Sequence, residues 1–245
     1  MSPGPLALVG SGEYLPVMTA TEALLLAGRA PRYVQIPTAA APEGEQSLSR
    51  WIELGKTQAE RLGVEAVPVV VKNRADADDP DLASLIDGAG LVYLSGGNPT
   101  FLAQTMRGTR VWDAVVSAWQ GGAALAGCSA GAMAMTGWVP QFRSLHLDPD
   151  PGLALVPHLR VIPHFDRMLG WVPDLLTRAV IHPPEGAHVL GIDEDTAAVD
   201  LSGGGQTWEV HGRQQVWEIA DGPRRGHPAG SAFTTRLLPR AVDNR

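Results

Sequence analysis

Short apolar runs alternate with helical patterns through the first half of the chain, and this alternation constrains the fold most. The runs are LALVG (6–10), RYVQIP (32–37), AVPVVV (66–71), LVYLSGG (91–97) and AALAG (123–127). Strands that are apolar on both faces belong to parallel sheets, and helices cover the two faces of such sheets. The sequence therefore predicts an α/β fold with a mostly parallel sheet.

The second half of the chain is less regular. LRVIPHF (159–165) predicts a strand, MLGWVPDLLTRAVI (168–181) a broken helix, and AHVLGIDEDTAAVDL (187–201) a strand or hairpin. Period-two alternation in TWEVHG (207–212) and QQVWEIA (214–220) predicts a C-terminal antiparallel hairpin. From about residue 221, Gly, Pro and Arg indicate an irregular tail. We find no repeat or linker that divides the chain, so we expect a single domain, residues 1–245.

Composition argues against several classes of function. The formal net charge is −7 and the basic residues form no stripe, so we expect no nucleic-acid partner. The single cysteine, Cys128, argues against a disulfide and a cysteine-based metal site, and we expect neither metal nor cofactor. The N-terminus lacks the basic region of a signal peptide, and no apolar run reaches the roughly eighteen residues of a membrane span. We therefore expect a cytoplasmic protein with no membrane partner.

The glycine-rich turn after the fifth predicted strand carries two neighbouring nucleophiles. GCSAG (127–131) joins a strand to a helix, as does the G-x-S-x-G pattern, whose central residue is held above the sheet on a strained turn. Ser129 has the central position. Cys128 comes one residue earlier, where strand alternation directs its side chain into the packing. A glycine-rich turn with a solvated serine is the alternative.

A nucleophilic serine needs a base and an acid that orients the base. Only His164 of the seven histidines ends an apolar strand, at the kind of sheet edge where Ser129 lies, and His158 and His146 are the next candidates. The segment GIDEDTA (191–197) supplies the acid candidates. Its three adjacent carboxylates repel one another, which is unusual for a strand with a purely structural role. These candidates are Asp193, Glu194 and Asp195, with a charged turn as the alternative.

The turn after the fourth strand, SGGNP (95–99), offers backbone N–H groups that no Cβ obstructs. Together, the N–H groups of Gly97 and Ala130 could form an oxyanion hole, because the residue after the nucleophile begins a helix. Asn98 either donates to the substrate or caps the next helix, with Pro99 at the first helical position. The two roles are compatible.

The chain also contains five longer blocks: YVQIPTAAAPE, VYLSGGNPTFL, GCSAGAMAM, VIPHFDR and GIDEDTAAV. In this order the blocks resemble the peptidase E and cyanophycinase family of serine peptidases, over about residues 6–201. The resemblance implies a class I glutamine-amidotransferase-like fold, a three-layer α/β/α sandwich with serine in place of cysteine. It also implies a Ser-His-Glu triad of Ser129, His164 and Glu194, with Gly97 and Ala130 as oxyanion donors.

Acyl transfer to water is the chemistry that the resemblance implies. His164 takes the proton of Ser129 as the serine attacks a carbonyl, and water later releases the acyl group. The substrate is then a peptide or another small amide, and we expect a small exopeptidase or dipeptidase related to peptidase E. Asn98, Arg167 and Arg178 are the candidates for substrate binding. Peptidase E reads a carboxylate with an arginine, but either arginine could instead be a surface ion-pair partner.

Three other functions stay open at this point. A cyanophycinase-like hydrolase would cut β-aspartyl-arginine bonds, and an amidase acting on non-peptide amides would use the same triad. A binding protein without activity would share only the scaffold, although an intact set of triad residues argues against it. The sequence leaves a monomer and a homodimer as alternatives.

Overall fold

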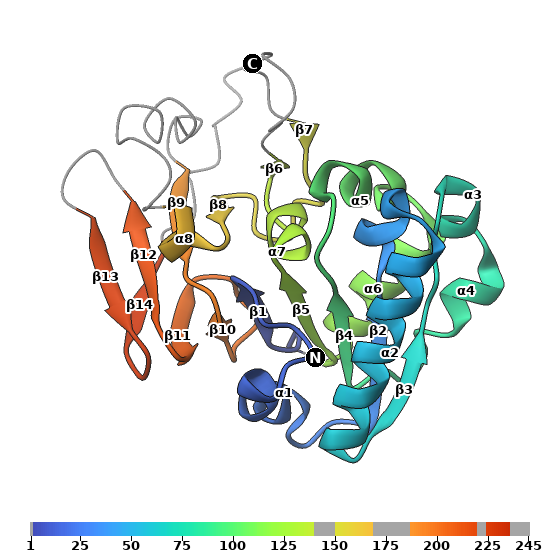
Figure 1. The fold of residues 1–245 in the computed structure, drawn as a ribbon, viewed down its shortest axis with the longest axis horizontal. Helices are drawn as coiled ribbons and strands as arrows, with labels where there is room; N and C mark the ends of the chain where they lie inside the picture. Colours follow the sequence, from blue (N-terminus) through green and yellow to red (C-terminus); the bar gives the residue numbers. More distant parts are fainter. Residues whose placement is uncertain (1, 140–149, 169–186, 220–223, 236–245) are drawn as a thin grey trace.

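The computed structural model describes residues 2–139, 150–168, 187–219 and 224–235. Its largest element is an eight-stranded sheet with the order β14-β11-β10-β1-β5-β4-β2-β3 (Figure 1). The parallel part of this sheet is made of β1 (Leu6–Val9), β5 (Ala124–Cys128), β4 (Leu91–Leu94), β2 (Arg32–Ile36) and β3 (Glu65–Pro68). These are the five strands that the apolar runs predicted, so the mostly parallel sheet is confirmed.

Antiparallel strands extend this sheet beyond β1, and further C-terminal strands form a second sheet. The large sheet gains β10 (Thr196–Asp200), β11 (Thr207–Gly212) and β14 (Ala232–Thr234). The second sheet contains, in order, β13 (Arg225–Pro228), β12 (Gln215–Ile219), β9 (His188–Ile192) and β8 (Leu159–Ile162). Only β8 and β9 are parallel in this sheet.

Helices cover both faces of the large sheet, because alternate side chains of its strands point to opposite sides. Leu6 and Leu8 of β1 join one buried cluster, and Ala7 and Val9 join another. The first cluster is covered by α3 (Arg74–Ala77), α4 (Pro80–Ser84), α5 (Pro99–Met106), α6 (Arg110–Gln120) and α7 (Ala130–Ala134). The second is covered by α1 (Thr19–Leu26) and α2 (Glu45–Leu62). This is the expected three-layer α/β/α sandwich.

Short elements complete the described chain: η1 (Pro16–Met18), η2 (Thr38–Glu43), β6 (Trp138–Val139), β7 (Asp150–Pro151) and α8 (Phe165–Met168). The second sheet shares the first buried cluster, to which Leu159 of β8, Leu190 of β9 and Val216 of β12 contribute. In the described ranges, no helix has the length and apolar character needed to cross a membrane.

The predicted pairing of residues 207–212 with residues 214–220 is wrong. Both segments contain strands, but β11 pairs with β10 and β14, whereas β12 pairs with β9 and β13. The chain passes from one sheet to the other between β11 and β12, and it does so again between β9 and β10. A period-two pattern identifies a strand with two unlike faces, but it does not identify the strand's partner.

The C-terminal tail also differs from the prediction. β13 and β14 lie within the segment expected to be irregular from about residue 221. Their inward side chains, His227 and Phe233, are buried and stack with ring centroids 4.6 Å apart. Few apolar residues mark these short strands, so the abundant Gly, Pro and Arg hid them. Except for Met168, the helix predicted over residues 168–181 lies outside the described residues.

Candidate active site

Ser129 lies on the turn between β5 and α7, with φ 49° and ψ −106°. A positive φ of this kind costs a non-glycine residue about 1–3 kcal/mol and is found most often at functional sites. The turn is tight because Gly127 and Gly131 meet backbone to backbone; a Cβ on Gly127 would lie 2.6 Å from the carbonyl carbon of Gly131. The backbone N–H of Ser129 donates to the carbonyl oxygen of Val9 at 2.9 Å, so β1 supports the turn.

Cys128 faces away from this turn into the core. Its side chain is fully buried, and Sγ donates to Oε2 of Glu13 at 2.8 Å. Burial, with the nearby charge of Glu13, raises the pKa of the Cys128 thiol well above its ordinary value. Only a thiolate is an effective nucleophile, so this cysteine is inert. The prediction that Cys128 packs inside is confirmed.

The second sheet carries His164 and Glu194. His164 lies two residues after β8, and Glu194 lies two residues after β9. Because β8 and β9 are parallel neighbours, their carboxyl ends lie at the same edge, and the two side chains meet there. His164 also has a positive φ, of 51°.

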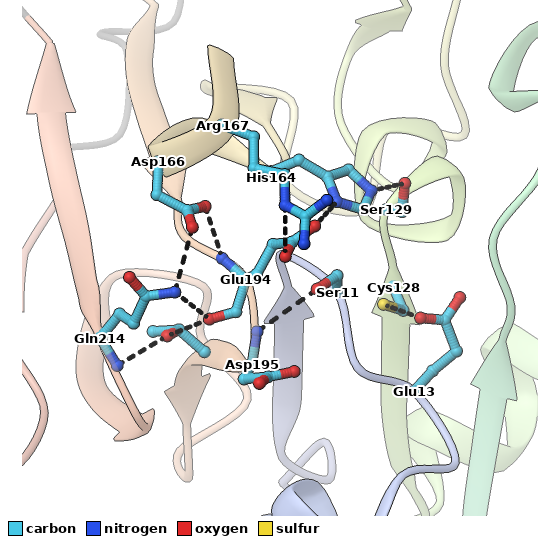
Figure 2. Close-up of polar contacts among 11 residues, drawn as sticks. Ser11, Glu13, Cys128, Ser129, His164, Asp166, Arg167, Glu194, Asp195 and Gln214 are labelled. Atoms are coloured by element: carbon cyan, nitrogen blue, oxygen red, sulfur yellow. Dashed lines mark hydrogen bonds and ion pairs between the residues drawn. The ribbon is translucent and has the colours of Figure 1, made fainter. Parts of the chain in front are cut away.

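Ser129, His164 and Glu194 form a chain of hydrogen bonds (Figure 2). Oγ of Ser129 lies 3.0 Å from Nε2 of His164, and Nδ1 of His164 lies 3.0 Å from Oε1 of Glu194. With the proton of a neutral imidazole on Nδ1, the ring donates to the carboxylate and Nε2 is free to accept from the serine. Nucleophile, base and orienting acid have this geometry in serine hydrolases.

The other base and acid candidates are engaged elsewhere. The carboxylate of Asp193 accepts from the indole N–H of Trp217 at 3.0 and 3.1 Å. Burial raises the pKa of Asp193, although these hydrogen bonds oppose the shift. Asp195 faces Arg213 at 3.6 Å, and Nε2 of the buried His158 lies 3.2 Å from the hydroxyl of Thr235. His146 lies outside the described residues.

Two backbone N–H groups belong to residues next to the serine turn, because a Cβ on Gly96, the residue before Gly97, would lie 3.7 Å from Cβ of Ser129. Ala130 begins α7 directly after the serine, and Gly97, with φ 134°, lies on the exposed turn after β4. Among the described residues, we find no protein acceptor for either N–H. Gly97 is followed by Asn98, whose N–H donates to the carbonyl oxygen of Ala39 at 2.7 Å. These two N–H groups therefore remain the candidate donors to an anion at Ser129.

The model of peptidase family S51 matches residues 6–206, which is most of the chain. The chain belongs to peptidase family S51. This family consists of serine peptidases, in agreement with the resemblance noted in the sequence.

Curated and solved relatives agree with this assignment. Cyanophycinases from Trichormus variabilis and from a Nostoc strain are each 29% identical over 184 residues, which is 71% of this chain. The matched region spans only 59% of the length of these relatives. The structure of a peptidase from an acI-B1 Actinobacterium is 39% identical, with a TM-score of 0.88 over 96% of this chain and 98% of that one.

A more distant solved structure supports the fold alone. A putative peptidase E protein from Listeria monocytogenes is 16% identical to this chain, with a TM-score of 0.57. The alignment covers 94% of this chain and all of that one.

The structure describes two of the three residues expected to bind substrate in this S51 peptidase. Asn98 caps α5, because its Oδ1 accepts from the N–H of Phe101 at 2.9 Å, and this leaves its amide nitrogen for a substrate. Nε of Arg167 forms an ion pair with Oε2 of Glu194 at 2.8 Å, although the arginine side chain is 73% exposed. Arg178 lies outside the described residues.

The sequence reasoning missed two residues that hold Glu194 in place. Oδ1 of Asp166 accepts from the backbone N–H of Glu194 at 2.9 Å. The amide of Gln214 donates to Oδ2 of Asp166 at 3.1 Å and to the carbonyl oxygen of Glu194 at 3.0 Å. Burial acts to raise the pKa of Asp166, but these donors outweigh burial and lower it. Asp166 lies within the VIPHFDR block, two residues after His164, and that proximity was the one available signal.

Proposed function

We propose that this S51 peptidase cleaves a peptide or other small amide through an acyl-enzyme on Ser129, with His164 as base and Glu194 as its orienting acid. The observation that carries the proposal is the pair of 3.0 Å contacts that joins the three side chains. The strained turn at Ser129 and the inert, buried Cys128 support the choice of nucleophile.

The steps follow from the positions of these groups. Nε2 of His164 accepts the Ser129 proton as Oγ attacks the substrate carbonyl, and the imidazolium then protonates the leaving amine. Water attacks the acyl-enzyme with the same histidine as base, which releases the acid and restores the serine. Glu194 keeps the imidazole in the correct tautomer and stabilises its charged form.

The N–H groups of Gly97 and Ala130 serve as the oxyanion hole in this proposal. Their support is that Ala130 directly follows Ser129, that Gly97 follows a residue close to Ser129, and that neither N–H donates to a described protein acceptor. Loss of one such donor typically costs about 10²–10³ in kcat. The amide nitrogen of Asn98, beside Gly97, can donate to a more distant carbonyl of the substrate.

A small exopeptidase or dipeptidase is the specific activity that we propose. The 39% identical relative is a peptidase, and 98% of its length matches this chain. A second candidate is hydrolysis of β-aspartyl-arginine bonds, because the curated relatives are cyanophycinases. The chain covers only part of those relatives, and Arg167 is already paired with Glu194, so we rank this candidate second.

A substrate panel tests the proposal. Purified protein is incubated with a dipeptide library, β-aspartyl dipeptides including β-aspartyl-arginine, and simple acyl amides, with mass spectrometry of the products. We expect cleavage of α-peptide bonds in dipeptides or at one chain end, and none by Ser129→Ala. Selective cleavage of β-aspartyl-arginine would favour the second candidate, and cleavage of acyl amides alone would favour a non-peptide amidase. Equal turnover by Ser129→Ala would contradict the mechanism.

A further inference from the structure

Glu13 is a buried carboxylate that none of the steps above uses. It lies in the turn after β1, and only 8% of the residue is exposed. Oε1 accepts from the backbone N–H of Gly96 at 3.0 Å, and Oε2 accepts from Sγ of Cys128 at 2.8 Å. Figure 2 shows Glu13 and Cys128 on one side of the serine turn and Glu194 on the other. One side chain therefore joins the turn after β1 to the turn after β4 and to the last residue of β5.

Both contacts of Glu13 fall next to the groups that perform the chemistry. Gly96 precedes Gly97, and Cys128 precedes Ser129. The approach to Gly96 is so close that a Cβ there would lie 2.6 Å from Oε1 of Glu13. A side chain at position 96 would therefore have to displace the carboxylate of Glu13.

The turn that presents Gly97 is held on both sides. Glu13 holds the N–H of Gly96 before it, and the carbonyl oxygen of Ala39 holds the N–H of Asn98 after it at 2.7 Å. Between these two anchors, the N–H of Gly97 has no described acceptor of its own. Its direction thus depends on the neighbouring peptide groups rather than on a hydrogen bond.

We propose that Glu13 is a positioning residue for the oxyanion hole: its carboxylate fixes the peptide before Gly97 and so aims the Gly97 N–H at the oxyanion. This inference rests on the proposed acyl-enzyme mechanism. A hydrogen-bond acceptor at this position is needed to satisfy the Gly96 N–H, because a buried, unpaired N–H is costly. A negative charge is not needed, since a charge near a developing oxyanion opposes it.

The acceptor role and the charge of Glu13 can be separated by substitution. Glu13→Gln keeps an oxygen for the Gly96 N–H and removes the charge, whereas Glu13→Ala removes both. Glu13→Asp keeps the charge but withdraws the carboxylate by one methylene. Cys128→Ala is the matched control, because it removes the other partner of Glu13 and leaves the Gly96 contact in place.

The experiment measures kcat and KM of these variants with the best amide from the substrate panel and with p-nitrophenyl acetate. A misplaced catalytic group costs up to about 10²-fold, so we expect Glu13→Ala to lose about 10- to 100-fold in kcat with KM changed less than about threefold. The kcat of Glu13→Gln should lie within about fivefold of the wild-type value, and the kcat of Cys128→Ala within about threefold. Glu13→Asp should lose about tenfold.

Several outcomes would overturn the inference. A wild-type kcat in Glu13→Ala would do so. So would a kcat of Glu13→Gln as low as that of Glu13→Ala. A kcat of Cys128→Ala as low as that of Glu13→Ala would do so as well. If circular dichroism shows that Glu13→Ala does not fold, the contrast between Glu13→Asp and Glu13→Gln decides in the same way. Failure of the mechanism itself looks different: wild-type protein would then show no turnover that depends on Ser129.

Discussion

The proposed catalytic groups come from two regions that hold their residues by different means. In the parallel region, Ser129 and Gly97 follow strands of one sheet, and the backbone itself supports the serine turn through the N–H of Ser129 and Val9 of β1. In the C-terminal region, His164 and Glu194 follow strands of the second sheet. There, the side chains of Asp166 and Gln214 hold the backbone of Glu194.

The difference shows that one rule of α/β folds applies twice in this molecule. The carboxyl ends of parallel strands gather functional residues, first at β5 and β4 and again at β8 and β9. The two edges meet because the chain crosses between the sheets at residues 193–195 and 213–214. Side-chain hydrogen bonds of Asp166 and Gln214 support the crossing at Glu194, so substitutions outside the triad should lower activity in the C-terminal region as well.

The largest expected effect tests whether the two regions act as one unit. We predict that Ser129→Ala and His164→Ala each lower kcat by about 10⁴–10⁶, because neither residue can act without the other. The double variant should be about as slow as either single variant. Steady-state kinetics on the best panel substrate measures all three. Multiplicative losses in the double variant would mean that the two residues act independently.

The second prediction concerns a buried carboxylate of the parallel region. Oε2 of Glu22 accepts from Tyr33 and Gln58, each at 3.0 Å, and burial raises the pKa of Glu22 to about 7. In the unfolded chain its pKa is near 4.5. Between these values the folded state keeps a proton that the unfolded state has lost, so stability falls as pH rises from 4.5 to 7 and is constant above.

Glu22→Gln should remove this loss, since the amide does not ionise. Urea unfolding measures the free energy of unfolding of both proteins at pH 4.5 and pH 8. Between these pH values, that of wild type should fall by on the order of 3 kcal/mol more than that of the variant. An identical pH dependence in the two proteins would show that the fold does not raise the pKa of Glu22.

The third prediction tests the side-chain support in the C-terminal region. Gln214→Ala removes the hydrogen bonds to Asp166 and to the carbonyl oxygen of Glu194. We expect kcat to fall about tenfold while KM changes little, because loosening Glu194 disturbs the histidine rather than substrate binding. Arg213→Ala is the control, because the side chain of this neighbour is 69% exposed and forms a 3.6 Å ion pair with Asp195, while its backbone hydrogen bond to Asp195 survives the substitution. Equal losses in both variants would argue against a specific role for Gln214.

The smallest expected effect separates two roles of Arg167. If its ion pair with Glu194 is its main role, Arg167→Gln should lower kcat by about threefold and leave KM unchanged, since exposed ion pairs contribute little. A role in substrate binding would appear instead as a raised KM for substrates with a carboxylate. The same kinetic assay, run with one acidic and one neutral substrate, distinguishes the two.

The sequence predicted local features well and pairings poorly. GCSAG places Ser129 on its turn without outside help, because strand, turn and small residues all lie within five positions. The choice of Glu194 over Asp193 needed the family resemblance, since three adjacent carboxylates look alike until their neighbours are known. Those neighbours, Trp217 and Gln214, are distant in sequence. The two-sheet arrangement escaped prediction for the same reason, because partner strands are chosen by tertiary packing.

The central claim is that the acyl group is carried by Ser129. Wild-type protein is mixed with p-nitrophenyl acetate, quenched in acid during turnover, digested and sequenced by tandem mass spectrometry. We predict that an acetyl group is found on Ser129 of the wild-type protein and of Cys128→Ala. We predict that Ser129→Ala carries no acetyl group at this position. An acetyl group on Cys128, or turnover without any modified residue at 129, would contradict the account.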